Sequence, residues 1–276
     1  MRLSIPSNKR PFSLDVTVRT GKPQAIRVSA FNKDKPKTYY LYHKGLVNGQ
    51  RTFELLFPKS ANTTIIDIFN TKNGNFKGKE DKSFTASLKL KGLKTCPIWM
   101  SPETTEFVKF AQFFAENASI LTSGDKVPHV YSSDSGKFHF SYFNKIRDRK
   151  TGNYVGTPAR IGHTTGIVEI SRRDFLLYTI PMRMIVLLHE YSHKFMNPKI
   201  GRPISDEVAA DINALMLYLS LGYSPIEAHQ AFLYVFKDAN NKQNFKRYLI
   251  IRDFIKKFAK GEVNNCQITS KQVVQT

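Results

Sequence analysis

The hydrophobic periodicity of this 276-residue chain changes once, near residue 96, and this change limits the folds that the sequence can adopt. Before it, apolar and polar residues alternate, as they do from Phe12 to Val18, which is typical of half-buried β-strands. After it, helical spacing of apolar residues appears, first from Phe107 to Leu121 and then over most of the chain from Thr179 onward. The sequence therefore predicts an α+β protein with two parts, whose boundary lies between Leu90 and Pro102.

The first part, residues 1–96, is expected to form an antiparallel β-sandwich that serves as an interaction or docking domain. Its expected strands are short, are separated by turns and have no helical pattern among them. They cover residues 12–19, 26–30, 38–42, 51–57, 63–69 and 83–90, with turns at Gly21-Lys22-Pro23 and at Asn48-Gly49.

The second part, residues 97–262, is expected to combine a small sheet with several helices. The expected strands are 129–132, 137–143 and 160–171, and a loop rich in Arg, Lys and Gly covers 145–156. Helix starts are expected at Ser101-Pro102, Thr179, Ser205, Ser224 and about Asn244, from N-cap residues, a capping box and Pro in first turns. The tail, residues 263–276, is polar and has no pattern.

One short motif in the helix that begins at Thr179 carries the chemistry. His189-Glu190-Tyr191-Ser192-His193 is an HExxH sequence. Residues four apart share a helical face, so both imidazoles can reach one metal ion while Glu190 stands beside it. Such a motif also arises by chance on amphipathic helices. Here, however, residues 184–188 place apolar side chains on nearly every face of the helix, which indicates that the helix is buried in the core. Buried imidazoles need polar partners, and a metal ion would be one.

A catalytic zinc site usually has three protein ligands and one open position, so a third ligand is needed. Glu207 is the best candidate: it lies in the first turn of the next helix, 14 positions after His193, and Asp211 follows one turn later on the same face. Asp206 competes, but it points about 100 degrees away and lacks a carboxylate four residues later. The segment 194–204 contains Pro and Gly, which favours a reversal that returns the second helix to the first.

Together these residues resemble the HExxH…ExxxD pattern of gluzincin-type zinc metallopeptidases. The resemblance implies one Zn²⁺ per chain, held by His189, His193 and Glu207. It also implies that Glu190 is the general base and that Asp211 is the carboxylate that holds His189.

The resemblance further implies a zincin-like domain with an active-site helix, a glutamate helix and a small sheet, in which the strand at 160–171 aligns the substrate. The implied activity is that of a zinc metalloendopeptidase acting on a peptide or protein. Many members of the group use a Tyr or His against the oxyanion, and here that residue stays open among His163, Tyr223, His229 and Tyr234.

Charge gives a less specific indication of function. The chain has 42 Lys and Arg against 22 Asp and Glu, a net charge of +20, and its first 100 residues hold 19 of these cations and 6 of these anions. Lysines on exposed strands also protect sheet edges, so solvation accounts for the charge equally well. The functional interpretation is an acidic protein surface or assembly partner for the first part. Nonspecific nucleic acid is a weaker interpretation, because no recognition motif is present.

The sequence shows no signal peptide and no membrane-length apolar run, so cytoplasmic synthesis and no membrane span are expected. Cys96 and Cys266 match no zinc-finger spacing. The Lys-, Asn-, Phe- and Tyr-rich composition resembles that of phage virion components, including those of crAss-like phages. The alternative to a peptidase is therefore a virion structural or assembly protein that keeps a zincin fold with little or no turnover.

Overall fold

The computed structural model describes residues 1–35, 38–72, 81–93, 95, 98–162, 164–195, 207–236 and 242–263. These residues form a mixed α+β structure with antiparallel sheet and six helices. The chain divides into two compact units, Met1–Thr95 with Gly222–Ser224, and Cys96–Leu221 with Pro225–Thr276. Five residues named above (Cys96, His163, Ser205, Asp206 and Cys266) lie outside the described residues, as do residues 196–204 of the expected reversal and the expected tail from residue 264 onward.

The first unit contains a five-stranded antiparallel sheet. Its strands are β1 (Arg2–Ile5), β2 (Phe12–Asn32), β3 (Tyr39–Phe57), β4 (Thr64–Asn70) and β5 (Thr85–Lys91). The strand order is β1-β4-β2-β3, and β5 also pairs with β2. The two halves of β2 have different neighbours, because residues 13–19 pair with β5 and residues 26–32 pair with β4.

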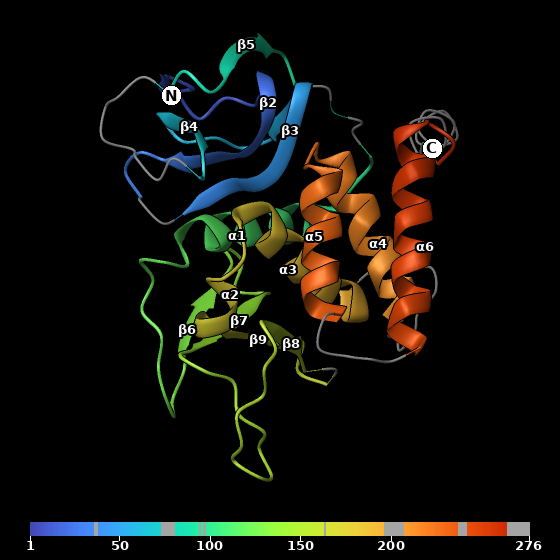
Figure 1. Ribbon diagram of the computed structural model, residues 1–276. Coiled ribbons are helices and arrows are strands. Elements are labelled where there is room, and N and C mark those ends of the chain that lie inside the picture. Colours follow the sequence, from blue (N-terminus) through green and yellow to red (C-terminus); the bar gives the residue numbers. More distant parts are fainter. Residues whose placement is uncertain are drawn as a thin grey trace. The chain divides into compact units, whose positions relative to one another are not determined.

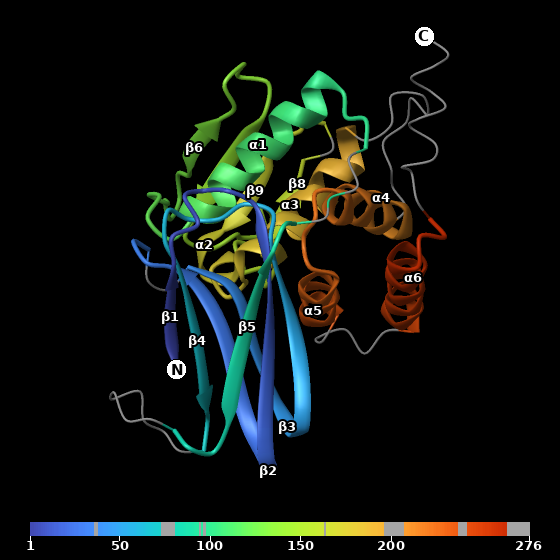
Figure 2. The ribbon, with the colours of Figure 1, turned by 90° about the horizontal axis from the view of Figure 1, so that it is seen from above.

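The two turns expected inside this sheet are bends within strands. Gly21-Lys22-Pro23 and Asn48-Gly49 do not end strands; they lie inside the continuous strands β2 and β3, which Figure 2 shows running side by side over their length. The reason is that the two breakers lie opposite each other, since Thr20 pairs with Gly49 and the register shifts between Thr20 and Gln24. A bulge at this point tolerates Pro and bends the ladder without ending it.

The bend allows β3 to fold back on itself. Tyr40 and Phe57, near opposite ends of this strand, have ring centroids only 5.9 Å apart. An extended strand would separate residues 17 positions apart by roughly 56 Å. The alternating apolar residues of both halves, among them Val16 and Val28, are fully buried. The expected alternation of buried and exposed residues is therefore correct, and the strands that show it belong to one bent sheet.

The second unit has a four-stranded sheet, β6 (His129–Ser132), β7 (His139–Phe143), β8 (Ala159–Ile161) and β9 (Val168–Ser171). The strand order is β6-β7-β9-β8, with β7 and β9 parallel and the other pairs antiparallel. The single strand expected at 160–171 is therefore wrong. A turn closed by the Gly166 N–H and the Gly162 carbonyl, 2.7 Å apart, reverses the chain, and Gly166 has the positive φ of +70° that this turn requires. The reversal places β8 at the edge of the sheet.

Six helices complete the described part of this unit. They are α1 (Pro102–Asn117), α2 (Arg172–Phe175), α3 (Ile180–Phe195), α4 (Glu207–Ser220), α5 (Pro225–Phe236) and α6 (Lys242–Ala259). Figure 1 shows α3 between the sheet and the group formed by α4, α5 and α6. All residues of α3 from Ile180 to Leu188 are buried, as the apolar run predicts. The sequence does not predict the short helix α2.

A buried arginine fixes the beginning of α3. Arg183 is 1% exposed, and its guanidinium donates hydrogen bonds to the carbonyl oxygens of Ala115 at 2.9 Å and Phe175 at 3.1 Å. These carbonyls belong to the last turn of α1 and to the end of α2, where unpaired carbonyl groups accumulate. One side chain therefore ties three helices together.

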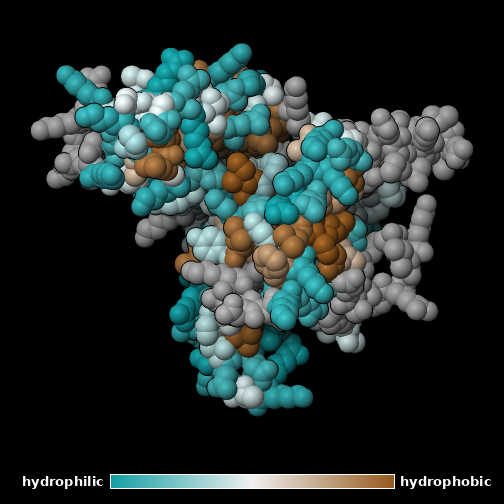
Figure 3. Space-filling model, turned by 45° about the vertical axis from the view of Figure 1, so that its right-hand side comes forward, coloured by the Kyte–Doolittle hydropathy of each residue, from teal (hydrophilic) through white to brown (hydrophobic). Residues whose placement is uncertain are grey.

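The outer helices are less deeply packed. Ile226 and Leu233 of α5 and Phe245 and Ile250 of α6 are exposed, and Figure 3 shows hydrophobic surface on the side of the molecule where these helices lie. Ile251 is the buried residue of α6. None of the helices in the described part of the chain combines the length and the apolar character that a membrane span requires.

Glu227 of α5 is a buried carboxyl at the start of α3. It is 1% exposed, and the Thr179 hydroxyl, just before α3, donates a hydrogen bond to it. Burial raises the pKa of Glu227 from 4.5 to about 7, and the Thr179 hydrogen bond opposes this rise only in part. The folded chain therefore holds this proton more tightly than the unfolded chain does.

We expect the free energy of unfolding to fall as pH rises from 4.5 through about 7, because over this range the folded state binds more protons at Glu227 than the unfolded state. The contribution of this carboxyl is at most about 3 kcal/mol. Glu227→Gln should remove that part of the decrease, measured by urea unfolding at pH 5 and pH 7.5. Glu262→Gln, at an exposed carboxyl, is the control. An identical pH dependence in wild type and Glu227→Gln would contradict the expectation.

Candidate metal site

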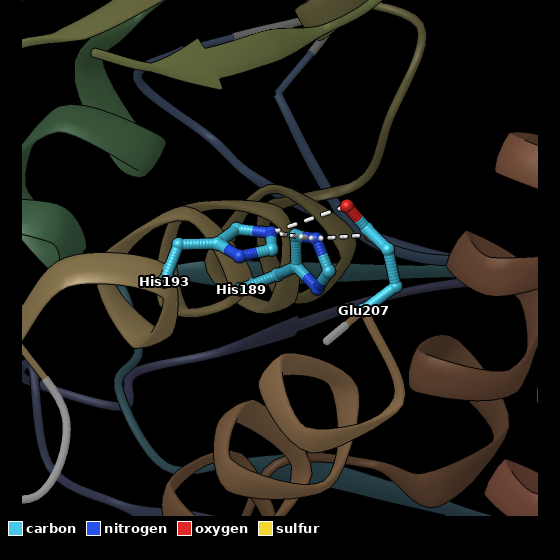
Figure 4. Close-up of side chains that lie close together, drawn as sticks. All are labelled: His189, His193 and Glu207. Atoms are coloured by element: carbon cyan, nitrogen blue, oxygen red, sulfur yellow. Dashed lines mark hydrogen bonds and ion pairs between the residues drawn. The ribbon is translucent and has the colours of Figure 1, made fainter. Parts of the chain in front are cut away.

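Three side chains from two helices converge at one point. His189 and His193 lie one turn apart on α3, and Glu207 is the first residue of α4. The Nε2 atoms of the two histidines are 3.1 Å apart, and the Glu207 carboxylate oxygens lie 3.4 Å from Nε2 of His189 and 3.6 Å from Nε2 of His193. Figure 4 shows the two rings and the carboxylate pointing toward one another.

This geometry fits a small divalent cation. Zinc binds imidazole nitrogen and carboxylate oxygen at about 2.0–2.1 Å, so the ligands of a tetrahedral ion lie about 3.3 Å apart. The three separations observed between the side chains span this value. All three potential ligand atoms also lie within 4.8 Å of one another. The donor set therefore suits zinc in both ligand type and spacing.

Asp211, one turn after Glu207 on α4, holds the ring of His189 from the other side. Its Oδ1 atom lies 2.9 Å from Nδ1 of His189, and its side chain is 1% exposed. A hydrogen bond at Nδ1 fixes the orientation of an imidazole and leaves Nε2 available to a metal ion. The structure thus brings together all four of the residues that the sequence suggested for the ligand set and its support.

Arg247 of α6 joins this group, and the sequence does not predict it. Its Nε and Nη2 atoms donate to the two oxygens of Asp211 at 2.9 Å and 3.0 Å, and Nη2 also lies 3.0 Å from Glu207. The sequence contains one indication: Arg247 precedes Ile251 by four residues, so a cation occupies the buried face of α6. Its partner could not be identified, because Asp211 lies 36 positions away.

Electrostatics couples the members of the cluster. Burial lowers the pKa of His189, but the hydrogen bonds with Asp211 and Glu207 and the charge of nearby carboxylates outweigh it and raise the pKa to about 10. The hydrogen bond with His189 lowers the pKa of Glu207 to about 2, although burial opposes it. Without a metal, the cluster is thus held by an ion pair, and a cation that binds there displaces a proton.

Glu190 stands beside the cluster in a different environment. Burial raises its pKa, and the positive charge of His189 and His193 together with a hydrogen bond from the backbone N–H of Ile161 opposes this rise. Ile161 belongs to β8, the edge strand. A carboxyl group with a raised pKa binds a proton more readily than an ordinary carboxylate, as a group that accepts a proton from water requires.

These residues lie in a cleft of about 330 Å³. Its described lining combines the polar cluster, strand β8 and apolar side chains of α3 and α5, namely Ile185, Val186, Ala231 and Phe232. Three of the four residues considered for the oxyanion, Tyr223, His229 and Tyr234, are not among the described residues that line it. The ring of His229 packs against Tyr248 at 5.0 Å and that of Tyr234 against Tyr178 at 5.9 Å. Arg247 instead brings a guanidinium to the cleft wall.

Comparison of the chain with protein-family models, with curated proteins and with solved structures gives no match. The chemical interpretation of the cleft therefore depends on its own residues and distances.

We expect Asp211→Asn to weaken zinc binding by about 10- to 100-fold, because the uncharged amide no longer pairs with Arg247 and holds His189 less firmly. The dissociation constant would be measured at pH 7.5 by competition with a chromophoric chelator, with circular dichroism to verify folding. Asp253→Asn, on an exposed part of α6, changes the charge equally and should bind zinc as wild type does. Equal affinities for Asp211→Asn and Asp253→Asn would contradict this role of Asp211.

Proposed function

We propose that this chain is a gluzincin-type zinc metallopeptidase that hydrolyses peptide bonds in a peptide or protein substrate. The observation that carries the proposal is the convergence of His189, His193 and Glu207 in a cleft, with Glu190 beside them. A structural metal site has no use for an additional carboxyl group poised to exchange protons. A hydrolytic site requires one.

The residues of the chain have separate parts in the proposed reaction. His189, His193 and Glu207 hold the ion, and zinc bound there would lower the pKa of water and polarise the scissile carbonyl. Glu190 accepts a proton from the attacking water and passes it to the nitrogen of the leaving amine as the C–N bond breaks. Asp211 keeps the ring of His189 oriented, and Arg247 holds the Asp211 carboxylate in place.

The surroundings of the cleft support a zincin-like arrangement. Helices α3 and α4 take the places of the active-site helix and the glutamate helix. Strand β8 pairs with β9 on one side only, in the described sheet, and lies along the cleft. An extended peptide can add to such an edge through main-chain hydrogen bonds. The substrate-aligning role expected for residues 160–171 is thus proposed for β8 alone.

The second candidate function is a virion structural or assembly protein that keeps this domain without turnover. The basic first unit favours an anionic docking partner in either case, since residues 1–100 hold 19 cations and 6 anions. Glu190 distinguishes the two functions, because only the peptidase needs it.

We expect Glu190→Gln to retain stoichiometric zinc and to lose about 10²- to 10⁴-fold in the rate of peptide hydrolysis, because the amide cannot accept the proton from water. Zinc content would be measured by inductively coupled plasma mass spectrometry, and cleavage of an unfolded protein by mass spectrometry. Glu103→Gln, at an exposed carboxyl on α1, is the matched control. A zinc-free wild-type protein would refute the metallopeptidase. Zinc without turnover in wild type would support the structural alternative.

A further inference from the structure

The Arg- and Lys-rich segment 145–156, together with Arg160, has no part in the proposed chemistry. Residues 145–160 contain five cations, Lys145, Arg147, Arg149, Lys150 and Arg160, and a single anion, Asp148. The Asp148 carboxylate accepts hydrogen bonds from the backbone N–H groups of Lys150 at 3.0 Å and Thr151 at 2.7 Å, so it closes a turn. We call these five cations the basic rim.

Arg160 connects the basic rim to the cleft. It lies on β8, lines the cleft and directly precedes Ile161, whose backbone N–H donates to the Glu190 carboxylate. Neighbouring residues of a strand are only about 3.3 Å apart along it. Arg160 is therefore one residue away from the strand position that contacts the proposed general base.

The guanidinium of Arg160 is held in a defined position. Its Nε atom donates to Glu169 at 2.8 Å, and its Nη2 atom donates to the backbone carbonyl of Arg147 at 3.0 Å. Arg149 also pairs with Glu169. The Glu169 side chain is 11% exposed, whereas those of Arg149 and Arg160 are 82% and 34% exposed. The carboxylate thus lies beneath two cations that remain accessible, and this part of the rim presents positive charge.

The opposite wall of the cleft does not cancel this charge. Its carboxylates, Glu207 and Asp211, are already paired with His189 and Arg247. On the β8 side, two arginines, Arg149 and Arg160, share the single carboxylate of Glu169, so a ligand that enters between the two walls meets a net positive charge there. Complementary charge at a binding surface contributes to partner selection more than to raw affinity.

We infer that the cleft selects substrates with an acidic side chain, Asp or Glu, within about two residues of the scissile bond, and that Arg160 is the specificity-determining residue. The inference rests on the proposed function, since it describes the substrate of the same cleft. The recognised group is a carboxylate on an extended peptide that runs along β8, where side chains on one face recur every second residue.

Matched internally quenched peptides test the inference on the zinc-loaded full chain. The peptides share one sequence and carry Glu, Gln or Lys at a single position, from the third residue before the scissile bond to the third after it. We expect kcat/KM to be about tenfold higher for Glu than for Gln in at least one position, and the ratio to fall toward one between 50 and 500 mM salt. Equal values for Glu and Gln at every position would overturn the inference.

Substitutions at Arg160 test whether this residue causes the preference for Glu over Gln. Arg160→Gln should reduce the Glu-to-Gln ratio below about threefold, and Arg160→Lys, which keeps the charge, should retain part of it. Lys109→Gln removes one charge from the exposed surface of α1 and is the matched control, for which the wild-type ratio is expected. A ratio that is the same in Arg160→Gln and Lys109→Gln would also overturn the inference.

A binding measurement separates failure of this inference from failure of the proposed function. Labelled Glu and Gln peptides are titrated with zinc-loaded Glu190→Gln protein, with and without Arg160→Gln, and followed by fluorescence anisotropy. If wild type cleaves no peptide but the Glu peptide binds about tenfold more tightly in an Arg160-dependent way, the peptidase is refuted and carboxylate recognition holds. If peptides are cleaved without any preference in rate or binding, the peptidase holds and carboxylate recognition is refuted.

Discussion

The burial of helix α3 is the constraint on which the rest of the second unit depends. An unpaired charge or polar group in a protein core costs several kcal/mol, so each such group on this helix requires a partner from elsewhere. Arg183 finds carbonyl groups at the ends of α1 and α2, and His189 finds Asp211 on α4. Neighbouring helices are thus held to α3 by the polar groups that it buries as well as by its apolar surface.

Arg247, Asp211 and His189 form one continuous connection between α6, α4 and α3. Helix α6 buries few apolar side chains, so its position depends strongly on this ion pair. The connection also balances charge, because Glu190, Glu207 and Asp211 would otherwise repel one another within one cleft. The geometry of the candidate metal site and the packing of the outer helix are therefore two consequences of the same interaction.

Local signals in the sequence were reliable where the structure they specify is itself local. Capping residues and helical periodicity predicted α1, α3, α5 and α6 within a few residues. Turn residues gave a wrong prediction where their effect depends on a partner strand. Either segment, residues 21–23 or residues 48–49, would be expected to end its strand, but the two lie opposite each other and bend the paired strands instead. The opposite error was made at residues 160–171, where one strand was expected. The composition of this run suits a strand, but a turn closed by Gly162 and Gly166 divides it into two.

The sequence by itself determined that His189 and His193 share a helical face with Glu190 beside them, because a spacing of four residues fixes this geometry within one α-helix. It also indicated Glu207 and Asp211, through the same spacing on the next helix. Only the tertiary structure decided that these two pairs meet at distances suited to a metal ion, that Arg247 joins them and that Arg160 borders their cleft. Those contacts join residues far apart in the chain, and their positions depend on packing of the whole unit, which no local pattern encodes.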